Sequence, residues 1–259
     1  MQQTFTRAWR SMALLLLSTT LAACASARDP RDPLEPMNRG VYAFNEGLDK
    51  VVLKPVAKGY KAAVPSPLRA GITNLFGNFA DVTTAINGVL QGNLSTAASD
   101  FGRIAINSTV GFFGVFDVAS RLGLQKHRKD FGQTLGKWGV QNGPYLVLPL
   151  LGPSTFRDTV GWVGDYFTDP EFYLVTQSPA TWLVFGTRVI NVRSNLLDSE
   201  QVLNMAAIDK YAFLRDAYLQ RRESMLFDVE PNFTIYPPTT PHRKTLKEME
   251  QELDVEEPQ

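Results

Sequence analysis

Cys24 is the only cysteine of the chain, so its thiol cannot form an internal disulfide and is left for packing, reactivity or covalent modification. The residues before it favour modification. Two arginines, Arg7 and Arg10, are followed by an apolar core, Met12–Leu17, and by small residues up to Ala23. This order is typical of a secretory signal, and the apolar core is shorter than the about 20 residues that a membrane-spanning helix needs.

The four residues Leu21–Cys24 resemble the lipobox of bacterial lipoproteins. The resemblance implies that the sulfur of Cys24 receives a diacylglycerol, that the chain is cleaved before this residue, and that the new amine is acylated. Each buried methylene contributes about 0.8 kcal/mol, so several chains would anchor the protein permanently. Ala25 stands where an aspartate would resemble an inner-membrane retention signal. We therefore expect a lipid anchor in the outer membrane of a Gram-negative bacterium, on the periplasmic side. The alternative is a plain signal peptide with an incidental cysteine.

No recognisable pattern for catalysis or metal binding accompanies this cysteine. His127 and His242 are the only histidines, and neither has a second metal ligand at a recognisable spacing. A Gly-x-Ser-x-Gly elbow is absent, and the segment 132–138 departs from a phosphate-binding loop in its glycine spacing and its last residue. Basic and acidic residues balance at 26 each, which gives no indication of nucleic-acid binding. We therefore expect that the protein is not an enzyme, that it binds no metal, and that it carries no cofactor other than the diacylglycerol and the N-acyl chain on Cys24.

A second set of residues could offer a polar path beside an apolar medium. Between residues 70 and 102 the only ionised side chains are Asp81 and Asp100, far fewer than the about one in four residues of a soluble domain. Apolar residues of the segment 68–90 recur at helical spacing. The opposite face is polar but almost uncharged, which suits a helix between lipid and a sheltered aqueous surface. The candidates for lining a lipid conduit are Asn74, Asn78, Thr84 and Asn87. The alternative is a core helix whose amides cap or cross-link other helices.

Glycines and prolines between residues 143 and 153 mark a third candidate region. Its prolines exclude one uninterrupted helix, so we expect a bent helical hairpin with an apolar tip near residues 145–151. Such interruptions supply hinges, and the candidates for a gate are Gly143, Pro144, Tyr145, Pro149, Gly152 and Pro153. A rigid structural turn is the alternative. Ser154 or Thr155 is expected to cap the helix that follows, with Asp158 in a structural role.

The patterns divide the chain into four parts. Residues 1–23 form a removable lipoprotein signal, and residues 24–36, rich in proline and charge, form a lipidated tether. Residues 37–227 are expected to form one helical domain. Residues 228–259 begin with several prolines and end in an acidic stretch, which predicts a disordered tail.

Four stretches resemble the MlaA (VacJ) family over residues 24–227: DPLEPMNRGVYAFN, FGNFADVTTAINGVLQG, DFGQTLGKWGVQNGPYLVLPLLGPSTFRD, and LLDSE followed by DKYAFLRDAYLQRR. The resemblance implies an all-α fold, a ring-like helical domain that lies in the inner leaflet of the outer membrane around an amphipathic channel. It also implies partners: phospholipids, a trimeric outer-membrane porin, and a soluble periplasmic lipid carrier resembling MlaC.

The function implied is a passive conduit. Phospholipids mislocalised to the outer leaflet would be removed and passed to the carrier, which maintains the lipid asymmetry of the outer membrane. Two other classes of function stay open. One is a structural lipoprotein that braces a porin or the envelope without moving lipid. The other is a lipid hydrolase, against which the near absence of histidine counts.

Overall fold

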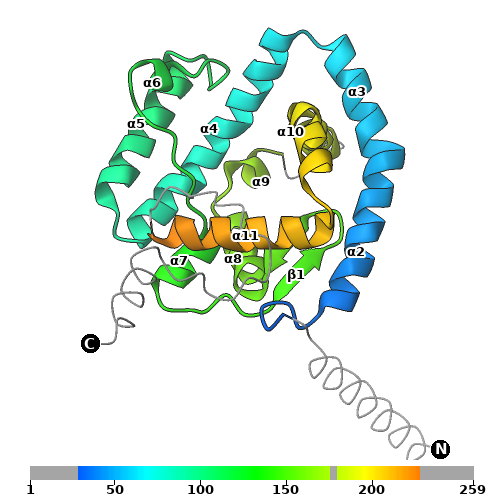
Figure 1. The fold of residues 1–259 in the computed structure, drawn as a ribbon. Helices are drawn as coiled ribbons and strands as arrows, with labels where there is room; N and C mark the ends of the chain where they lie inside the picture. The colour runs from blue at the N-terminus through cyan, green and yellow to red at the C-terminus, as the bar shows by residue number, and fades with distance from the viewer. Residues whose placement is uncertain (1–28, 176–179, 228–259) are drawn as a thin grey trace, which may run out of the picture. The chain divides into compact units, whose positions relative to one another are not determined.

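Helices make up most of the structure, a computed structural model that describes residues 29–175 and 180–227 (Figure 1). The helices are α2 (Glu35–Leu48), the π-helical turn η1 (Asp49–Leu53), α3 (Lys54–Ala63), α4 (Ser66–Leu90), α5 (Leu94–Thr109), α6 (Val118–Arg121), α7 (Phe131–Lys137), α8 (Phe156–Tyr166), α9 (Pro170–Val175), α10 (Ala180–Ala206) and α11 (Lys210–Phe227). Two strands, β1 (Tyr145–Leu148) and β2 (Gly152–Thr155), complete it. The predicted helical class is confirmed. The signal 1–23, Cys24 and the tail 228–259 lie outside the described residues.

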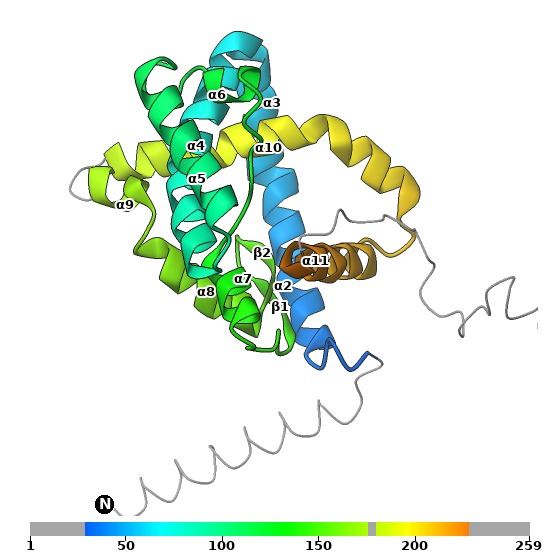
Figure 2. The same cartoon turned by 90° about the vertical axis from the view of Figure 1, so that its left-hand side faces the viewer.

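The helices contact one another in a closed circuit. α2 continues through η1 into α3, α3 packs against α10, and α10 packs against α4. α4 lies along α5 and also contacts α7; α7 pairs with α8 and contacts α11, and α11 returns to β2 (Figures 1 and 2). β1 closes the circuit on α2. None of the helices in the described part of the chain combines the length and the apolar content needed to cross a bilayer.

Short polar side chains set the start of four helices. Asn93, Asp117, Asp130 and Thr155 each accept a hydrogen bond from a backbone N–H in the first turn of α5, α6, α7 and α8, respectively. Such bonds satisfy donors that a helix leaves unpaired, which is why these residue types are preferred there. The predicted cap of α8 is confirmed at Thr155, which accepts from the backbone of Asp158 at 3.1 Å.

The predicted helical hairpin of residues 143–153 is wrong in its secondary structure: the segment forms an antiparallel β-hairpin. Leu148 pairs with Gly152, and the turn between them places Leu150 at a φ of 67°. Prolines so close together leave too few N–H donors for a helical turn, whereas each strand of a two-stranded ribbon is an edge that tolerates proline.

Helix α2 supplies the hydrogen bonds that a third strand would provide to this hairpin. The side chain of Asn38 donates to the carbonyl oxygen of Tyr145 at 3.0 Å and accepts from the N–H of Val147 at 2.9 Å. Asn45 does the same at the turn, donating to Leu148 and accepting from Leu150. These contacts to a distant helix explain why the local sequence pattern did not predict strands.

The described part of the segment 24–36, residues 29–36, is folded against the helical domain. α2 begins at Glu35, and Asp32 is fully buried. Asp32 accepts hydrogen bonds from Asn38 and from the hydroxyl of Tyr211 on α11. Arg215 of α11 adds ion pairs to Asp29 at 3.2 Å and to Asp32 at 3.4 Å. The segment from residue 29 onward is therefore part of the helical domain.

Candidate functional site

Many polar and charged side chains are buried in this structure, and many large apolar side chains are exposed. A soluble domain shows the reverse, with apolar groups buried and charges facing water. The largest fully buried side chains among the described residues are Arg103, Tyr145, Gln133, Asn38, Asn87, Asn191, Thr134, Thr155, Asp32, Asp81, Asp100 and Ser194. Many large apolar side chains are exposed instead, and the most exposed include Val51, Val110, Phe112, Phe113, Leu122, Leu150, Trp182, Leu183 and Phe227. A surface of this kind marks contact with a membrane or a partner.

One part of this surface is a loop that presents two phenylalanines. Phe112 and Phe113 have φ values of 52° and 57°, a left-handed conformation that is strained for bulky residues. Their rings lie edge to face at 5.7 Å and are largely exposed. Backbone bonds hold the turn, among them Gly114 N–H to Asn107 and Phe116 N–H to Gly111, both 2.8 Å. The fold therefore holds these two residues in a strained backbone conformation in which their aromatic rings face outward.

A buried ion cluster supports the loop from below. The guanidinium of Arg103 contacts Asp117 at 3.1 Å and Asp81 at 3.3 Å, and it donates to the carbonyl oxygen of Leu124 at 2.7 Å. Burial acts to raise the pKa of Asp117, but hydrogen bonds from Ser120, Asn107 and Arg103 outweigh it and hold the pKa well below its ordinary value. The few charged side chains of this region are therefore paired with one another in the interior, where they hold the neighbouring segments together.

A cleft of about 740 Å³ lies between α4, the segment 126–130, α8 and α10. Its lining combines apolar side chains, including Phe76, Ala80, Trp162, Val163 and Val192, with polar and charged ones, including Thr84, Lys126, Asp165, Arg188 and Asn191. This volume is within the range of about 300–1,000 Å³ typical of small-molecule sites. A cleft with both kinds of wall suits an amphipathic molecule.

A second cavity, of about 250 Å³, lies beneath the β-hairpin. Leu148, Leu151 and Pro153 of the hairpin line it, and it shares Asp130, Trp162 and Asp165 with the cleft. The two spaces therefore adjoin at those three side chains.

The carboxyl group of Asp165 in this shared wall is electrostatically unusual. Burial raises its pKa to about 7, and the nearby charge of Asp130 acts in the same direction. Its oxygens accept from the N–H of Phe131 at 2.9 and 3.1 Å and from the amide of Asn87 at 2.9 Å. These hydrogen bonds lower the pKa of Asp165 by less than burial and Asp130 raise it, so Asp165 is partly protonated near neutral pH.

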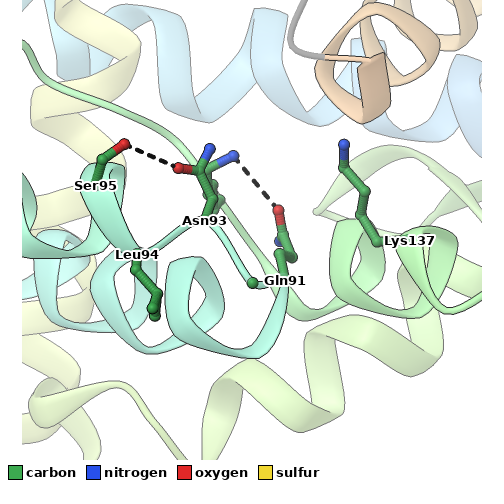
Figure 3. Close-up of a pocket in the computed structure, with 7 residues that line it drawn as sticks. Gln91, Asn93, Leu94, Ser95 and Lys137 are labelled. Carbon is green, nitrogen blue, oxygen red and sulfur yellow. Dashed lines mark hydrogen bonds between the residues drawn. The ribbon is translucent and has the colours of Figure 1, made fainter.

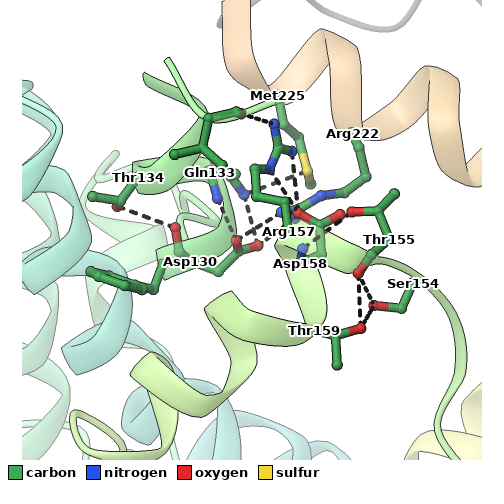
Figure 4. A network of polar contacts seen from close by, with 12 residues as sticks. Asp130, Gln133, Thr134, Ser154, Thr155, Arg157, Asp158, Thr159, Arg222 and Met225 are labelled. Carbon is green, nitrogen blue, oxygen red and sulfur yellow. Dashed lines mark hydrogen bonds and ion pairs between the residues drawn. The ribbon is translucent and has the colours of Figure 1, made fainter. Parts of the chain in front are cut away.

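Asp130 belongs to a network that joins α7, α8 and α11 (Figure 4). Arg222 of α11 reaches Asp130 at 2.9 Å and Asp158 at 2.7 Å. Burial acts to raise the pKa of Asp130, but Arg222 outweighs it and lowers that pKa. Tyr218 donates to the other oxygen of Asp158 at 2.8 Å. The structural role predicted for Asp158 agrees with these contacts.

A separate depression of about 420 Å³ forms where α4 ends and α5 begins (Figure 3). Ser95 donates to Asn93 and Lys129 donates to Gln91, both at 3.4 Å. Lys129 is only 6% exposed, whereas Lys126 and Arg128 in the same segment are exposed. His127 itself contacts the buried Asp100 at 2.9 Å.

The four conduit candidates occupy different environments. Thr84 is among the residues that line the cleft. Asn74 donates to the carbonyl oxygen of Val115, Asn78 to the hydroxyl of Ser108, and Asn87 to Thr83 and Asp165. The three asparagines therefore hydrogen-bond α4 to other segments of the chain, as expected for the alternative in which these amides cross-link helices. Their role in lipid passage stays a prediction.

The six gate candidates all lie in or beside the β-hairpin. Tyr145 is 1% exposed and packs edge to face on Tyr211 at 6.3 Å. Gly143 and Gly152 adopt φ values of 66° and 87°, which glycine accepts without strain. Pro153 lines the cavity beneath the hairpin, whereas Leu150 at the tip is exposed. One end of the hairpin is therefore anchored and its tip is apolar. A gating motion stays a prediction.

Sequence reasoning missed the charged residues of the ion cluster, the cleft and the network around Asp130, namely Arg103, Asp165, Arg188 and Arg222. One signal was available: isolated charges in a charge-poor stretch, such as Asp81 and Arg103, must find each other if the stretch is buried. The partners of Asp165 and Arg222 come from distant segments and carried no local signal. Among the described residues no group of three or more potential metal ligands is present.

Comparison with known proteins places this geometry in a family. The family model described as MlaA lipoprotein matches residues 30–225. The intermembrane phospholipid transport system lipoprotein MlaA of Escherichia coli is 34% identical over 256 residues, covering 95% of this chain and 99% of the relative. The protein of the same description from Haemophilus influenzae is 31% identical over 227 residues, 84% of this chain and 90% of the relative.

A relative from Rickettsia bellii with no assigned function is 37% identical over 198 residues, 76% of this chain and 77% of its own. A solved structure from work on the structural basis for maintenance of bacterial outer membrane lipid asymmetry superposes with a TM-score of 0.66 at 34% identity. It covers 75% of this chain and 98% of the solved one. With the fold, the family model and full-length relatives in agreement, the chain belongs to the MlaA lipoprotein family.

Proposed function

We propose that this protein is an outer-membrane lipoprotein that transports phospholipid between membranes and so maintains the lipid asymmetry of the outer membrane. The single observation that carries the proposal is the reversed distribution of side chains around an amphipathic cleft. The relatives from Escherichia coli and Haemophilus influenzae are described as phospholipid transport lipoproteins, which supports the same function.

The physical task is to move a polar headgroup past hydrocarbon. The transfer of a headgroup into an apolar medium without hydrogen-bond partners is unfavourable, with a free-energy cost of the order of 2–7 kcal/mol for a single polar group. Side chains such as Thr84, Asn191 and Arg188 in the cleft can replace part of the lost hydration. The acyl chains meanwhile contact Phe76, Val163 or the outer apolar surface. No energy source is required, so the protein acts as a passive conduit.

The direction and the partners complete the proposal. Acyl chains on Cys24 anchor the protein on the periplasmic side of the outer membrane. The exposed apolar surface then meets the hydrocarbon of that leaflet and the wall of a trimeric porin. Phospholipid mislocalised to the outer leaflet passes to a periplasmic carrier resembling MlaC, which takes it away.

The hairpin can regulate this passage as a gate. Its residues Leu148, Leu151 and Pro153 border the cavity that adjoins the cleft, so a movement of the tip would change access to both. A disulfide that joins an engineered cysteine at Leu151 to one at Trp162 should block transport in the oxidised form and restore it on reduction. Full transport by the oxidised protein would contradict the gate and favour a rigid turn.

The polar face of α4 is tested by substitution of its amides. Replacing Asn74 and Asn78 by leucine should lower lipid removal while expression and acylation stay normal. Because these amides also hold Val115 and Ser108, the thermal unfolding of the variant must be measured beside its transport. Unchanged lipid asymmetry would contradict a role in the conduit.

The function itself is tested by measuring outer-leaflet phospholipid in cells with and without the protein. Accumulation of intact phospholipid on deletion supports transport. Release of fatty acid that depends on the protein would instead indicate a hydrolase. No change in lipid would indicate a lipoprotein that braces a porin or the envelope.

A further inference from the structure

Asp165 lines both the cleft and the cavity beneath the β-hairpin, and within residues 29–175 and 180–227 it forms no ion pair. It accepts hydrogen bonds only from neutral donors, the N–H of Phe131 and the amide of Asn87. The other aspartates that line these two spaces each have a cationic partner: Asp81 pairs with Lys126, Asp169 with Arg188, and Asp130 and Asp158 with Arg222. Asp165 is therefore the carboxyl group of this wall that lacks a counter-ion.

The charges around the hairpin cavity favour a cation over an anion. Its lining includes three aspartates, Asp130, Asp158 and Asp165, but a single arginine, Arg222. Burial, followed by the negative charge of Asp130, raises the pKa of Asp165 to about 7, so its ionised form is disfavoured while no cation is present. A cation beside Asp165 would compensate this charge, whereas an anion would be repelled.

Arg222 in the same lining holds a donor that has no acceptor. Its terminal nitrogens bind Asp130 and Asp158, but its Nε atom is buried and lacks a hydrogen-bond partner among the described residues (Figure 4). The side chain is only 9% exposed, so this donor is an exception to the rule that buried polar groups are paired. A molecule that brings both a cation and an oxygen acceptor would suit the two side chains together.

The surrounding walls indicate what such a molecule carries besides its charges. Trp162 lines both spaces, and the face of an indole ring attracts cations. Beyond it, Phe76, Val163 and Val192 line the cleft and can hold hydrocarbon. A phospholipid with a zwitterionic headgroup combines a cation, phosphate oxygens and acyl chains.

We propose that Asp165 binds the primary ammonium group of an ethanolamine phospholipid whose acyl chains occupy the adjoining cleft. This inference rests on the proposed function and deepens it, because it names the headgroup that the protein recognises. An ammonium group can donate a charge-assisted hydrogen bond to the carboxylate. The quaternary ammonium of a choline headgroup has no N–H to donate, and a glycerol headgroup has no cation.

The test uses the full-length acylated protein in mixed micelles at pH 8, where Asp165 is mostly ionised. The micelles contain phosphatidylethanolamine, phosphatidylcholine and phosphatidylglycerol with the same acyl chains, and native mass spectrometry counts the lipid that stays bound. Wild-type protein should favour phosphatidylethanolamine over either of the others by about tenfold, the effect of one hydrogen bond to a charged group. Asp165→Asn should bind the three lipids about equally.

Two matched variants make the result specific. Asp198→Asn removes an exposed carboxylate outside the lining of both spaces and should keep the preference. Asp165→Glu keeps the charge and should retain part of the preference, and it also guards against misfolding of the asparagine variant.

Four outcomes would overturn the inference. The first is a preference that survives in Asp165→Asn, and the second is an equal loss in Asp198→Asn. The third is wild-type protein that binds phosphatidylcholine or phosphatidylglycerol as strongly as phosphatidylethanolamine, which would leave the proposed function intact. The fourth is displacement of the lipid by free ethanolamine at the same concentration, which would indicate a site for a soluble amine. Wild-type protein that retains none of the lipids would contradict the proposed function as well, so the two failures are distinguishable.

Discussion

Replacing Asp165 by asparagine should make the protein more stable at pH 8 and change it much less at pH 5. The carboxyl group has a pKa of about 7 in the folded protein, against 3.8 for an ordinary aspartate, because burial and the nearby charge of Asp130 disfavour its ionised form. Between about pH 3.8 and pH 7 the folded state therefore keeps a proton that the unfolded chain has already released. Stability contributed by this group is complete below pH 3.8, falls as the pH rises, and is constant above about pH 7.

The size of the effect follows from the shift. Each pKa unit corresponds to about 1.4 kcal/mol, so between pH 5 and pH 8 the wild-type protein should lose up to about 3 kcal/mol relative to the variant. Because Asp165 is partly accessible to solvent, screening reduces this figure to about 2 kcal/mol. Asparagine keeps an oxygen that can accept from Phe131 and Asn87, so the local hydrogen bonds are largely preserved.

The assay is urea unfolding of the acylated protein in a non-ionic detergent, at several pH values between 5 and 8. Fluorescence of Trp162, which lines the same wall, reports the transition. Asp198→Asn is the matched control for the change of residue type, because the side chain of Asp198 is 83% exposed and its exposed ion pair with Lys61 should contribute little to the free energy of unfolding.

A constant difference between Asp165→Asn and wild type across this pH range would refute the reasoning. So would a variant that loses stability relative to wild type as the pH rises, because that sign requires a carboxylate favoured by folding.

Three further predictions concern the packing that supports the site. Arg103→Met should destabilise the protein by about 3–5 kcal/mol in denaturant unfolding, because Asp81 and Asp117 lose a buried partner, whereas Arg121→Met should change little. Asn38→Ala should cost about 3 kcal/mol by the same measurement, since it leaves the buried polar groups of Tyr145 and Val147 unpaired; a cost below that of Asn45→Ala would contradict this. In vesicles with brominated acyl chains, a tryptophan introduced by Phe113→Trp should be quenched, and one introduced by Glu223→Trp, at an exposed position of α11, should not; equal quenching would contradict membrane contact of the loop.

Local patterns in the sequence were sufficient to predict the helical class and several helix boundaries. The spacing of apolar residues in segment 68–90 reports one face of a helix, and α4 spans Ser66–Leu90. A hydroxyl residue before a helix is a local signal as well, which is why Thr155 was recognised as a cap. The charge-poor middle of the chain indicated an apolar environment, in agreement with the exposed apolar side chains of the structure.

The hairpin and the first residues of the domain could not be predicted in the same way. The strands form because Asn38 and Asn45 on α2 satisfy their backbone groups, about a hundred residues away in the sequence. Asp32 is held by Tyr211 and Arg215 in the same manner. Periodicity describes only neighbours along the chain, so it contains no information about partners of this kind.

The sequence by itself determined the helical class, the long helix of segment 68–90, where a lipid anchor is expected, and that the middle of the chain avoids charge. Each follows from the types of residues that are close to one another along the chain. Only the tertiary structure decided which polar side chains are buried as partners of one another and which line the cleft. Those properties depend on how segments far apart in sequence approach one another, and charge compensation is set by distance in space.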